Sequence, residues 1–252
     1  MADKEQNIVE HLDELRKRLI ISAVAFFTFF IVGFIYVEDI YQWFVRDLDA
    51  KLIILGPSDI VWVYFSLASI VAIAGTIPVM ALQIWLFIKP GLTKKEQKLS
   101  LSYIPGLFLL FIGGLAFGYF IIFPIIMEFL VNLGSQMMEP SFTAEKYFRF
   151  IMSVTLPFGV LFELPVIVMF LTSLGIINPT WLKKIRKYAY FVLFIIAAAI
   201  TPPDLITEIL VAIPLIVLYE ISTSLSGFVY KRKLKKDQEL EKASEYEPID
   251  EN

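Results

Sequence analysis

Long apolar runs alternate with short charged segments along the whole chain. A helix needs ~20 apolar residues, at ~1.5 Å each, to cross the hydrocarbon core of a bilayer. Lipid tolerates only helices and closed barrels, and these runs lack the period-2 alternation of barrel strands. The pattern predicts an all-α integral membrane protein with one six-helix domain over 1–230. The predicted transmembrane helices cover 19–37, 60–88, 99–127, 150–175, 188–201 and 205–230.

The basic residues lie mostly on one side of these runs. They gather in the N-terminal segment, in the second-to-third and fourth-to-fifth connections, and after the last run. Cytoplasmic segments of membrane proteins carry an excess of Lys and Arg. Both termini are therefore predicted to be cytoplasmic, with the helices in the plasma membrane. A hydrophobic content of 58% and a mean hydropathy of +0.71 agree with this class.

The fifth apolar run is shorter than a membrane span requires. Its fourteen residues, 188–201, would extend about 21 Å as a helix, against ~30 Å of hydrocarbon. The turn that follows, TPPD at 201–204, carries no basic residue. Either this hairpin ends within the bilayer or the bilayer thins around it. From 231 to 252 the chain becomes polar and acidic, and we expect a disordered cytoplasmic tail.

One acid, Glu163, lies inside the fourth apolar run. An ionised carboxylate there costs several kcal/mol unless it is neutralised, paired or hydrated. Pro157 and Pro165 flank it, and we expect each to interrupt the backbone hydrogen bonds. Two interpretations remain open. Glu163 is a protonated packing residue bonded to a neighbouring helix, or it is a functional group of the membrane interior.

Two other acids lie on the predicted cytoplasmic face. Glu14 belongs to an amphipathic segment, 8–19, and precedes Arg18 by four residues, a favourable order for an ion pair. Glu96 follows Thr93 at the capping-box spacing of a helix start. Paired surface charges and helix capping explain both acids without any function. A peptide arriving from the cytosol would nevertheless meet these two carboxylates first.

The composition excludes most enzyme classes. The chain has no Cys, and its single histidine, His11, precedes the first apolar run. A buried Ser-His site, a zinc site of the HExxH type and a glycine-rich phosphate loop are therefore not predicted, and we expect no catalytic residue, metal or cofactor. Two classes remain. One is a proton-coupled transporter of small solutes with Glu163 as the proton site, and the other is a docking scaffold for peptides or partner helices.

Four motifs decide between these classes. They are HLDELRKRL at 11–19, FIKPGL at 87–92 with the following Glu96, FELP at 162–165 and TPPD at 201–204. In this order and spacing they resemble the TatC family, the receptor subunit of the twin-arginine protein translocase. The resemblance covers about residues 8–230 and excludes the tail.

The resemblance implies a concave, glove-like helix bundle with a short fifth and sixth helix. Its function would be to bind twin-arginine signal peptides and to export folded proteins with the proton gradient. Glu14 and Glu96 match the acids of the signal-peptide site in this family. Further residues tied to that site are Arg16, Phe87, Pro90 and Lys98. The acid matching Glu163 lies in the groove of the bundle.

The resemblance also implies partners. Single-span subunits of the TatA/TatB type would dock near the TPPD turn, and a homo-oligomer within a larger complex in membrane lipid is expected, without nucleic acid. The docking positions are Thr201, Pro202, Pro203, Asp204 and Glu208. Many relatives carry a neutral amide where this chain has Glu208. Consecutive arginines of an extended peptide point to opposite sides, so carboxylates on two segments would bracket them.

Overall fold

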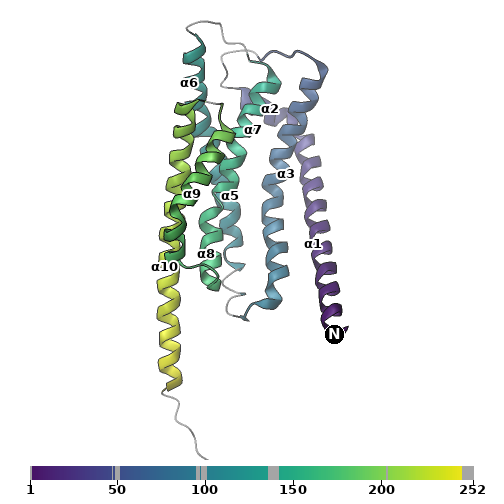
Figure 1. Cartoon of the computed structure of the whole chain (residues 1–252). Helices are drawn as coiled ribbons and strands as arrows, with labels where there is room; N and C mark the ends of the chain where they lie inside the picture. Colours follow the sequence, from purple (N-terminus) through teal and green to yellow (C-terminus); the bar gives the residue numbers. More distant parts are fainter. Residues whose placement is uncertain are drawn as a thin grey trace, which may run out of the picture. The chain divides into compact units, whose positions relative to one another are not determined.

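The computed structural model describes residues 2–46, 48, 52–94, 97, 101–135, 142–202 and 204–245. The elements in chain order are α1 (Ala2–Ile35), α2 (Val37–Val45), α3 (Pro57–Ile88), η1 (Lys89–Gly91), α5 (Ile104–Phe117), η2 (Gly118–Ile122), α6 (Phe123–Ser135), α7 (Ala144–Leu161), α8 (Leu164–Leu174), α9 (Pro179–Ile200) and α10 (Leu205–Glu245) (Figure 1). Within these residues the only β-pairing is an isolated bridge between Ile53 and Thr143. The prediction of an all-α protein is confirmed.

Five helical stretches of the described chain are long and apolar enough to cross a membrane. They are Leu12–Ile35, Pro57–Gly91, Ile104–Gly134, Ala144–Leu174 and Leu205–Lys235. The fifth predicted span, 188–201, covers the second part of α9 and its C-cap Thr201, and the first turns of α9 carry the basic residues of 183–187. A sixth crossing by α9 therefore stays a prediction.

The chain forms two compact units, Met1–Phe162 and Glu163–Asn252. In the first unit α3 packs against α1, α5 and α7, and α1 and α3 run antiparallel (Figure 1). Two glycines, Gly114 and Gly118, lie where the backbone comes very close to α7. A Cβ added at Gly114 would lie 2.6 Å from the carbonyl oxygen of Phe158, and one at Gly118 would lie 2.9 Å from Cα of Thr155. Small residues allow α5 and α7 to touch backbone to backbone.

The third and fourth spans differ from their predicted bounds. The third runs from Ile104 through a π-helical turn at Gly118–Ile122 and ends beyond residue 127. The fourth is two helices, because α7 ends at Leu161 and α8 begins at Leu164. Pro157 lies inside α7 and does not end it, so only Pro165, the second residue of α8, coincides with a break. A proline fits the first turn of a helix because the missing N–H has no partner there.

Aromatic side chains fasten α2 to the rest of the first unit. The rings of Phe44 and Tyr119 lie 4.9 Å apart, those of Trp43 and Tyr119 5.3 Å apart, and those of Phe44 and Phe148 5.9 Å apart. These distances are within the range of stabilising ring contacts. These ring contacts therefore tie α2 to η2 and α7.

In the second unit α10 packs against both α8 and α9. α9 begins at Pro179 because the side chain of Asn178 accepts a hydrogen bond from the backbone N–H of Trp181, at 2.7 Å. A hydrogen bond of 2.8 Å between the hydroxyl oxygens of Thr172 and Ser226 joins α8 to α10.

The last helix corrects the predicted tail. α10 continues from Leu205 to Glu245, so the prediction of a disordered segment from 231 does not hold as far as Glu245. The residues from 231 to 245 are mainly Lys, Glu, Leu, Gln and Ala, which are strong helix formers. The polarity of these residues indicated exposure to water. A helix in water and a loop in water are both polar, so polarity did not distinguish between them.

Candidate functional site

Glu14 is bound by an arginine of its own helix. Nε of Arg18 donates to Oε1 of Glu14 at 3.1 Å, and Nη2 of Arg18 donates to the same oxygen. On the other side of the guanidinium, Nη1 lies 3.5 Å from Oε1 of Gln83 on α3. The side chain of Arg18 is only 20% exposed. The pair that the sequence spacing predicted is thus present, and it also contacts α3.

Arg16 belongs to a different charge cluster. Its Nη2 lies 2.5 Å from Oδ1 of Asp13, and Nζ of Lys17 lies 3.0 Å from the other oxygen of the same carboxylate. Both basic side chains are well exposed. The structure therefore places Arg16 beside Asp13 rather than beside Glu14.

The second predicted segment begins where α3 ends. Phe87 is in the last turn of α3, and Pro90 is in η1. Gln83 precedes Phe87 by four residues, so both lie on one face of α3. Through the contact of Arg18 with Gln83, Glu14 is connected to the face of α3 that bears Phe87.

Gln97 closes the turn after η1, and the sequence analysis missed it. Its side-chain amide donates to the carbonyl oxygens of Lys89 and Leu92, at 3.0 Å each. Its backbone N–H donates to the carbonyl of Thr93 at 2.9 Å, which is a helical bond. The sequence feature that could have drawn attention to Gln97 is its position next to Glu96. Glu96 and Lys98 lie outside the described residues.

Glu163 occupies the break between α7 and α8. The residue is buried, with 7% of its surface exposed. Neither of its carboxylate oxygens has a hydrogen-bond partner within the described chain. The interpretation of Glu163 as a packing residue bonded to a neighbouring helix thus has no partner among those residues. Only its backbone carbonyl is engaged, by the N–H of Ile167 at 3.0 Å.

The TPPD turn caps α10. Oδ1 of Asp204 accepts from the backbone N–H groups of Ile206 and Thr207, at 3.1 and 2.8 Å. Its Oδ2 accepts from the hydroxyl of Thr207 at 2.5 Å. The hydroxyl and backbone bonds from Thr207 hold the pKa of Asp204 below its ordinary value. The carboxylate is therefore already engaged within the chain, as an N-cap.

The other predicted docking residues surround this cap. Thr201 is buried, and its hydroxyl donates to the carbonyl of Ala197 at 3.0 Å. Pro202 and Glu208 are half-buried, while Pro203 lies outside the described residues. No cluster of potential metal ligands is present in the described part of the chain.

The chain matches known proteins over most of its length. The family model described as "Sec-independent protein translocase protein (TatC)" matches residues 10–214. Two proteins of Bacillus subtilis strain 168 are similar. TatCd is 54% identical over 94% of this chain and 98% of its own, and TatCy is 44% identical over 93% and 94%.

Solved structures agree with these relatives. A crystal structure of the twin arginine translocase receptor TatC superimposes with a TM-score of 0.76 and 32% identity, covering 87% of this chain and 99% of that one. A second crystal structure of that receptor, in DDM, gives a TM-score of 0.77 and 34% identity over 86% and 99%.

Proposed function

Because this chain belongs to the TatC family of Sec-independent protein translocase proteins, we propose that Glu14 and Glu96 form its binding site for twin-arginine signal peptides. The protein is a multi-pass membrane component of a protein translocase. Folded cargo proteins would follow their bound signal peptides across the plasma membrane, driven by the proton gradient. Transport of small solutes through Glu163 is not favoured, because the family consists of protein translocase components.

The observation that carries this proposal is that Glu14 already binds a guanidinium group. Two N–H groups of Arg18 converge on one carboxylate oxygen of Glu14. Charge-assisted bonds of this kind are among the strong hydrogen bonds of proteins. Both N–H groups bind Oε1, so Oε2 of Glu14 is left to accept a guanidinium from a peptide.

A second carboxylate on another segment completes the proposed site. Gln97, whose side chain binds two carbonyls of the turn that follows α3, is the described residue next to Glu96 in the sequence. The contact between Arg18 and Gln83 supports a short distance between α1 and this end of α3. Carboxylates from two segments would bind two consecutive arginines on opposite sides of an extended peptide. Arg16, Phe87, Pro90 and Lys98 would complete the surroundings of the site.

The orientation and partners extend the proposal. The excess of basic residues at both ends supports a cytoplasmic location for both termini. Glu163, buried without a partner in the described chain, would be neutral at rest and would contact the signal peptide after it has entered the membrane. Single-span subunits would dock beside the capped turn at Thr201, Pro202, Pro203, Asp204 and Glu208, in a homo-oligomer within a larger complex.

Crosslinking in membranes tests the site. A photoreactive group next to the arginine pair of a signal peptide should crosslink to positions beside Glu14 and Glu96, and a twin-lysine peptide should crosslink weakly. Glu14→Gln should reduce twin-arginine binding roughly tenfold, since it removes a charge-assisted contact of about 1.5 kcal/mol.

Asp13→Asn is the matched control. Asp13 is the neighbouring acid on α1, and its partners are Arg16 and Lys17 rather than Arg18. It should bind the peptide like the parent protein. Equal losses in the two variants would mean that the peptide is attracted by general negative charge, and the proposal would fail.

A further inference from the structure

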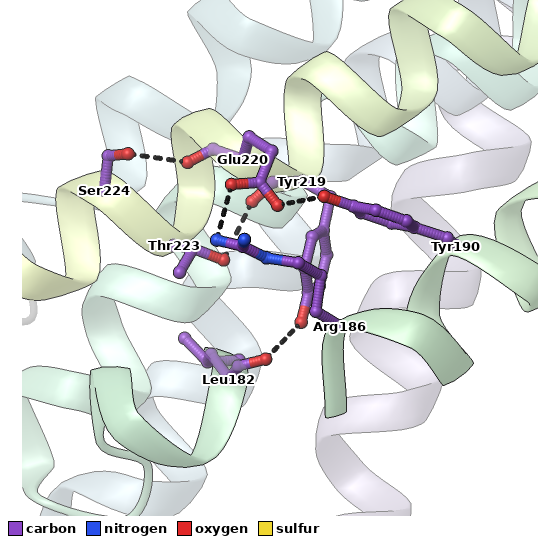
Figure 2. Close-up of polar contacts among 7 residues, drawn as sticks. All are labelled: Leu182, Arg186, Tyr190, Tyr219, Glu220, Thr223 and Ser224. Atoms are coloured by element: carbon purple, nitrogen blue, oxygen red, sulfur yellow. Dashed lines mark hydrogen bonds and ion pairs between the residues drawn. The ribbon is translucent and has the colours of Figure 1, made fainter. Parts of the chain in front are cut away.

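A polar cluster between α9 and α10 has no part in the proposed peptide site. Figure 2 shows the carboxylate of Glu220 between the side chains of Arg186 and Tyr190. Nη2 of Arg186 donates to Oε2 of Glu220 at 2.8 Å, and the hydroxyl of Tyr190 donates to Oε1. The hydroxyl of Tyr219 donates to the carbonyl of Leu182 at 2.8 Å. These bonds hold one face of α9 against α10.

The charge and exposure of this ion pair, rather than its distance from the turn, favour a place near the edge of the hydrocarbon. Arg186 precedes the end of α9 by fourteen residues, which corresponds to roughly 21 Å along the helix. Glu220 follows the start of α10 by fifteen residues, which corresponds to roughly 22 Å. The side chains of Arg186 and Glu220 are 42% and 36% exposed. A charge exposed to hydrocarbon is costly, so these groups must lie among lipid headgroups.

The guanidinium has donors that the cluster does not use. Arginine carries five N–H donors, and one of them binds Glu220. Nε of Arg186 is buried without a hydrogen-bond partner in the described chain. Glu220, itself bound by the hydroxyl of Tyr190, fixes the orientation of the guanidinium, and the side chain of Arg186 stays partly exposed.

Two lysines form a basic face together with Arg186. Lys183 and Lys187 are exposed and four residues apart, and Arg186 follows Lys183 by three residues, so the helical period places Arg186 and Lys187 on either side of Lys183 along one side of α9. Trp181 and Tyr188 are exposed on the other side of α9 and have the composition of a membrane-interface belt, and Nζ of Lys187 lies 5.2 Å from the ring centroid of Tyr188. Against these three cations, Glu220 supplies one negative charge, so the face retains a positive charge that a phosphate can neutralise.

We propose that Arg186, Lys183 and Lys187 form a binding site for the phosphate of an anionic phospholipid. Its location in the cytoplasmic leaflet rests on the orientation proposed above. Glu220 is a positioning residue, because it binds the guanidinium and leaves the phosphate to the cations, and Tyr190 supports it by donating its hydroxyl to the other carboxylate oxygen. An anionic lipid fits better than a signal peptide, since a peptide with consecutive arginines would be repelled by this face.

Native mass spectrometry of the purified full-length protein tests this site. The protein in detergent is mixed with equal amounts of phosphatidylglycerol and phosphatidylcholine, and the retained lipids are counted. The parent should retain phosphatidylglycerol in roughly tenfold preference, the range of one or two charge-assisted contacts. The double variant Lys183→Gln and Lys187→Gln should lose most of this preference while the bonds of Glu220 remain.

Lys184→Gln is the control, because Lys184 is an exposed neighbour that precedes Arg186 by two residues and therefore lies on the opposite side of α9 from its guanidinium. It should keep the preference of the parent. A similar loss in Lys184→Gln would show general charge attraction and would overturn the site. Equal retention of the two lipids by the parent protein would also overturn the proposed lipid site. The basic face of α9 would then be a site for an acidic protein segment instead.

Measuring lipid retention and peptide binding in the same variants separates the proposed lipid site from the proposed peptide site. Glu14→Gln should lose twin-arginine peptide and keep phosphatidylglycerol, while the double lysine variant should do the reverse. The lipid count in detergent does not depend on the orientation of the chain or on peptide binding.

Discussion

Arg18 binds Glu14 one helical turn away and contacts Gln83 of α3 with the other side of its guanidinium. The arginine therefore has two effects at the proposed peptide site. It connects α1 to α3, and it places a positive charge on the carboxylate that would receive an arginine of the signal peptide. Both effects can be measured by substitution.

Replacing Arg18 should strengthen peptide binding. Arg18→Gln removes the guanidinium that competes for Glu14, and a partly exposed ion pair of this kind contributes about 0.3–1 kcal/mol. We expect a two- to fivefold higher affinity for twin-arginine peptides, measured by titration in membranes. Gln83→Leu, which removes the partner on α3 and keeps the charge, should not raise the affinity. A weaker affinity in Arg18→Gln would mean that Arg18 positions Glu14 rather than competing for it.

The charge of Glu96 can be tested separately from the helix capping that its spacing from Thr93 predicts. Glu96→Gln keeps a capping side chain and removes the charge. If Glu96 receives an arginine, this variant should lose about 1.5–3 kcal/mol of twin-arginine binding, roughly ten- to hundredfold, and change twin-lysine binding little. Thermal unfolding of the same sample should be unchanged. Parental affinity in this variant would exclude Glu96 from recognition.

Glu163 should matter after recognition. Glu163→Gln keeps the shape and stays neutral, so we expect it to fold and to bind the signal peptide like the parent. Glu163→Lys introduces a charge into a buried position and should prevent deep insertion of the peptide. Transport rates in inverted vesicles, together with peptide binding, measure the two steps. Normal transport by the lysine variant would exclude this role.

Two adjacent glycines provide a packing test. In Gly114→Ala the new Cβ would lie 2.6 Å from the carbonyl oxygen of Phe158, so α5 and α7 must separate. Overpacking of this kind costs typically 1–3 kcal/mol. In Gly113→Ala the new Cβ meets no atom within 4 Å of the described chain, and the substitution should be neutral or slightly stabilising. Thermal unfolding in detergent compares the two, and equal midpoints would contradict the close contact.

The cap of α10 should depend on pH. The hydroxyl of Thr207, followed by its backbone N–H, lowers the pKa of Asp204 below the ordinary value of 3.8. A group whose pKa is depressed in the folded state stabilises it fully above the unfolded pKa. That contribution is then lost as the pH falls through the folded value. Asp204→Asn, which also caps helices, should lose less stability than the parent between pH 5 and pH 3, as followed by thermal unfolding. Identical pH profiles would show that the carboxylate charge does not contribute.

Local spacing predicted the features that depend on one segment. The ion pair of Glu14 and Arg18 follows from the four-residue period of a helix, and the membrane helices follow from the length of the apolar runs. The family resemblance likewise rested on short motifs. All of these can be judged from residues that are close in sequence.

Helix ends outside the membrane were harder to predict. α9 begins at Pro179, before the basic residues that we assigned to a loop, although Asn178 and Pro179 form a recognisable helix start. α10 continues to Glu245 for a related reason. The hydrophobic pattern locates the part of a helix that contacts lipid, and it carries no information about where the helix ends in water.

The sequence by itself determined the membrane class, the apolar spans, the candidate acids and the family motifs, because each depends on composition or on short spacing. Only the tertiary structure decided which distant side chains meet. Arg18 and Gln83 are 65 residues apart, and Arg186 and Glu220 are 34 residues apart. Their contacts require particular faces of two helices to pack together. That choice depends on the fit of many side chains and on glycines such as Gly114, not on the polarity of the residues that finally bind.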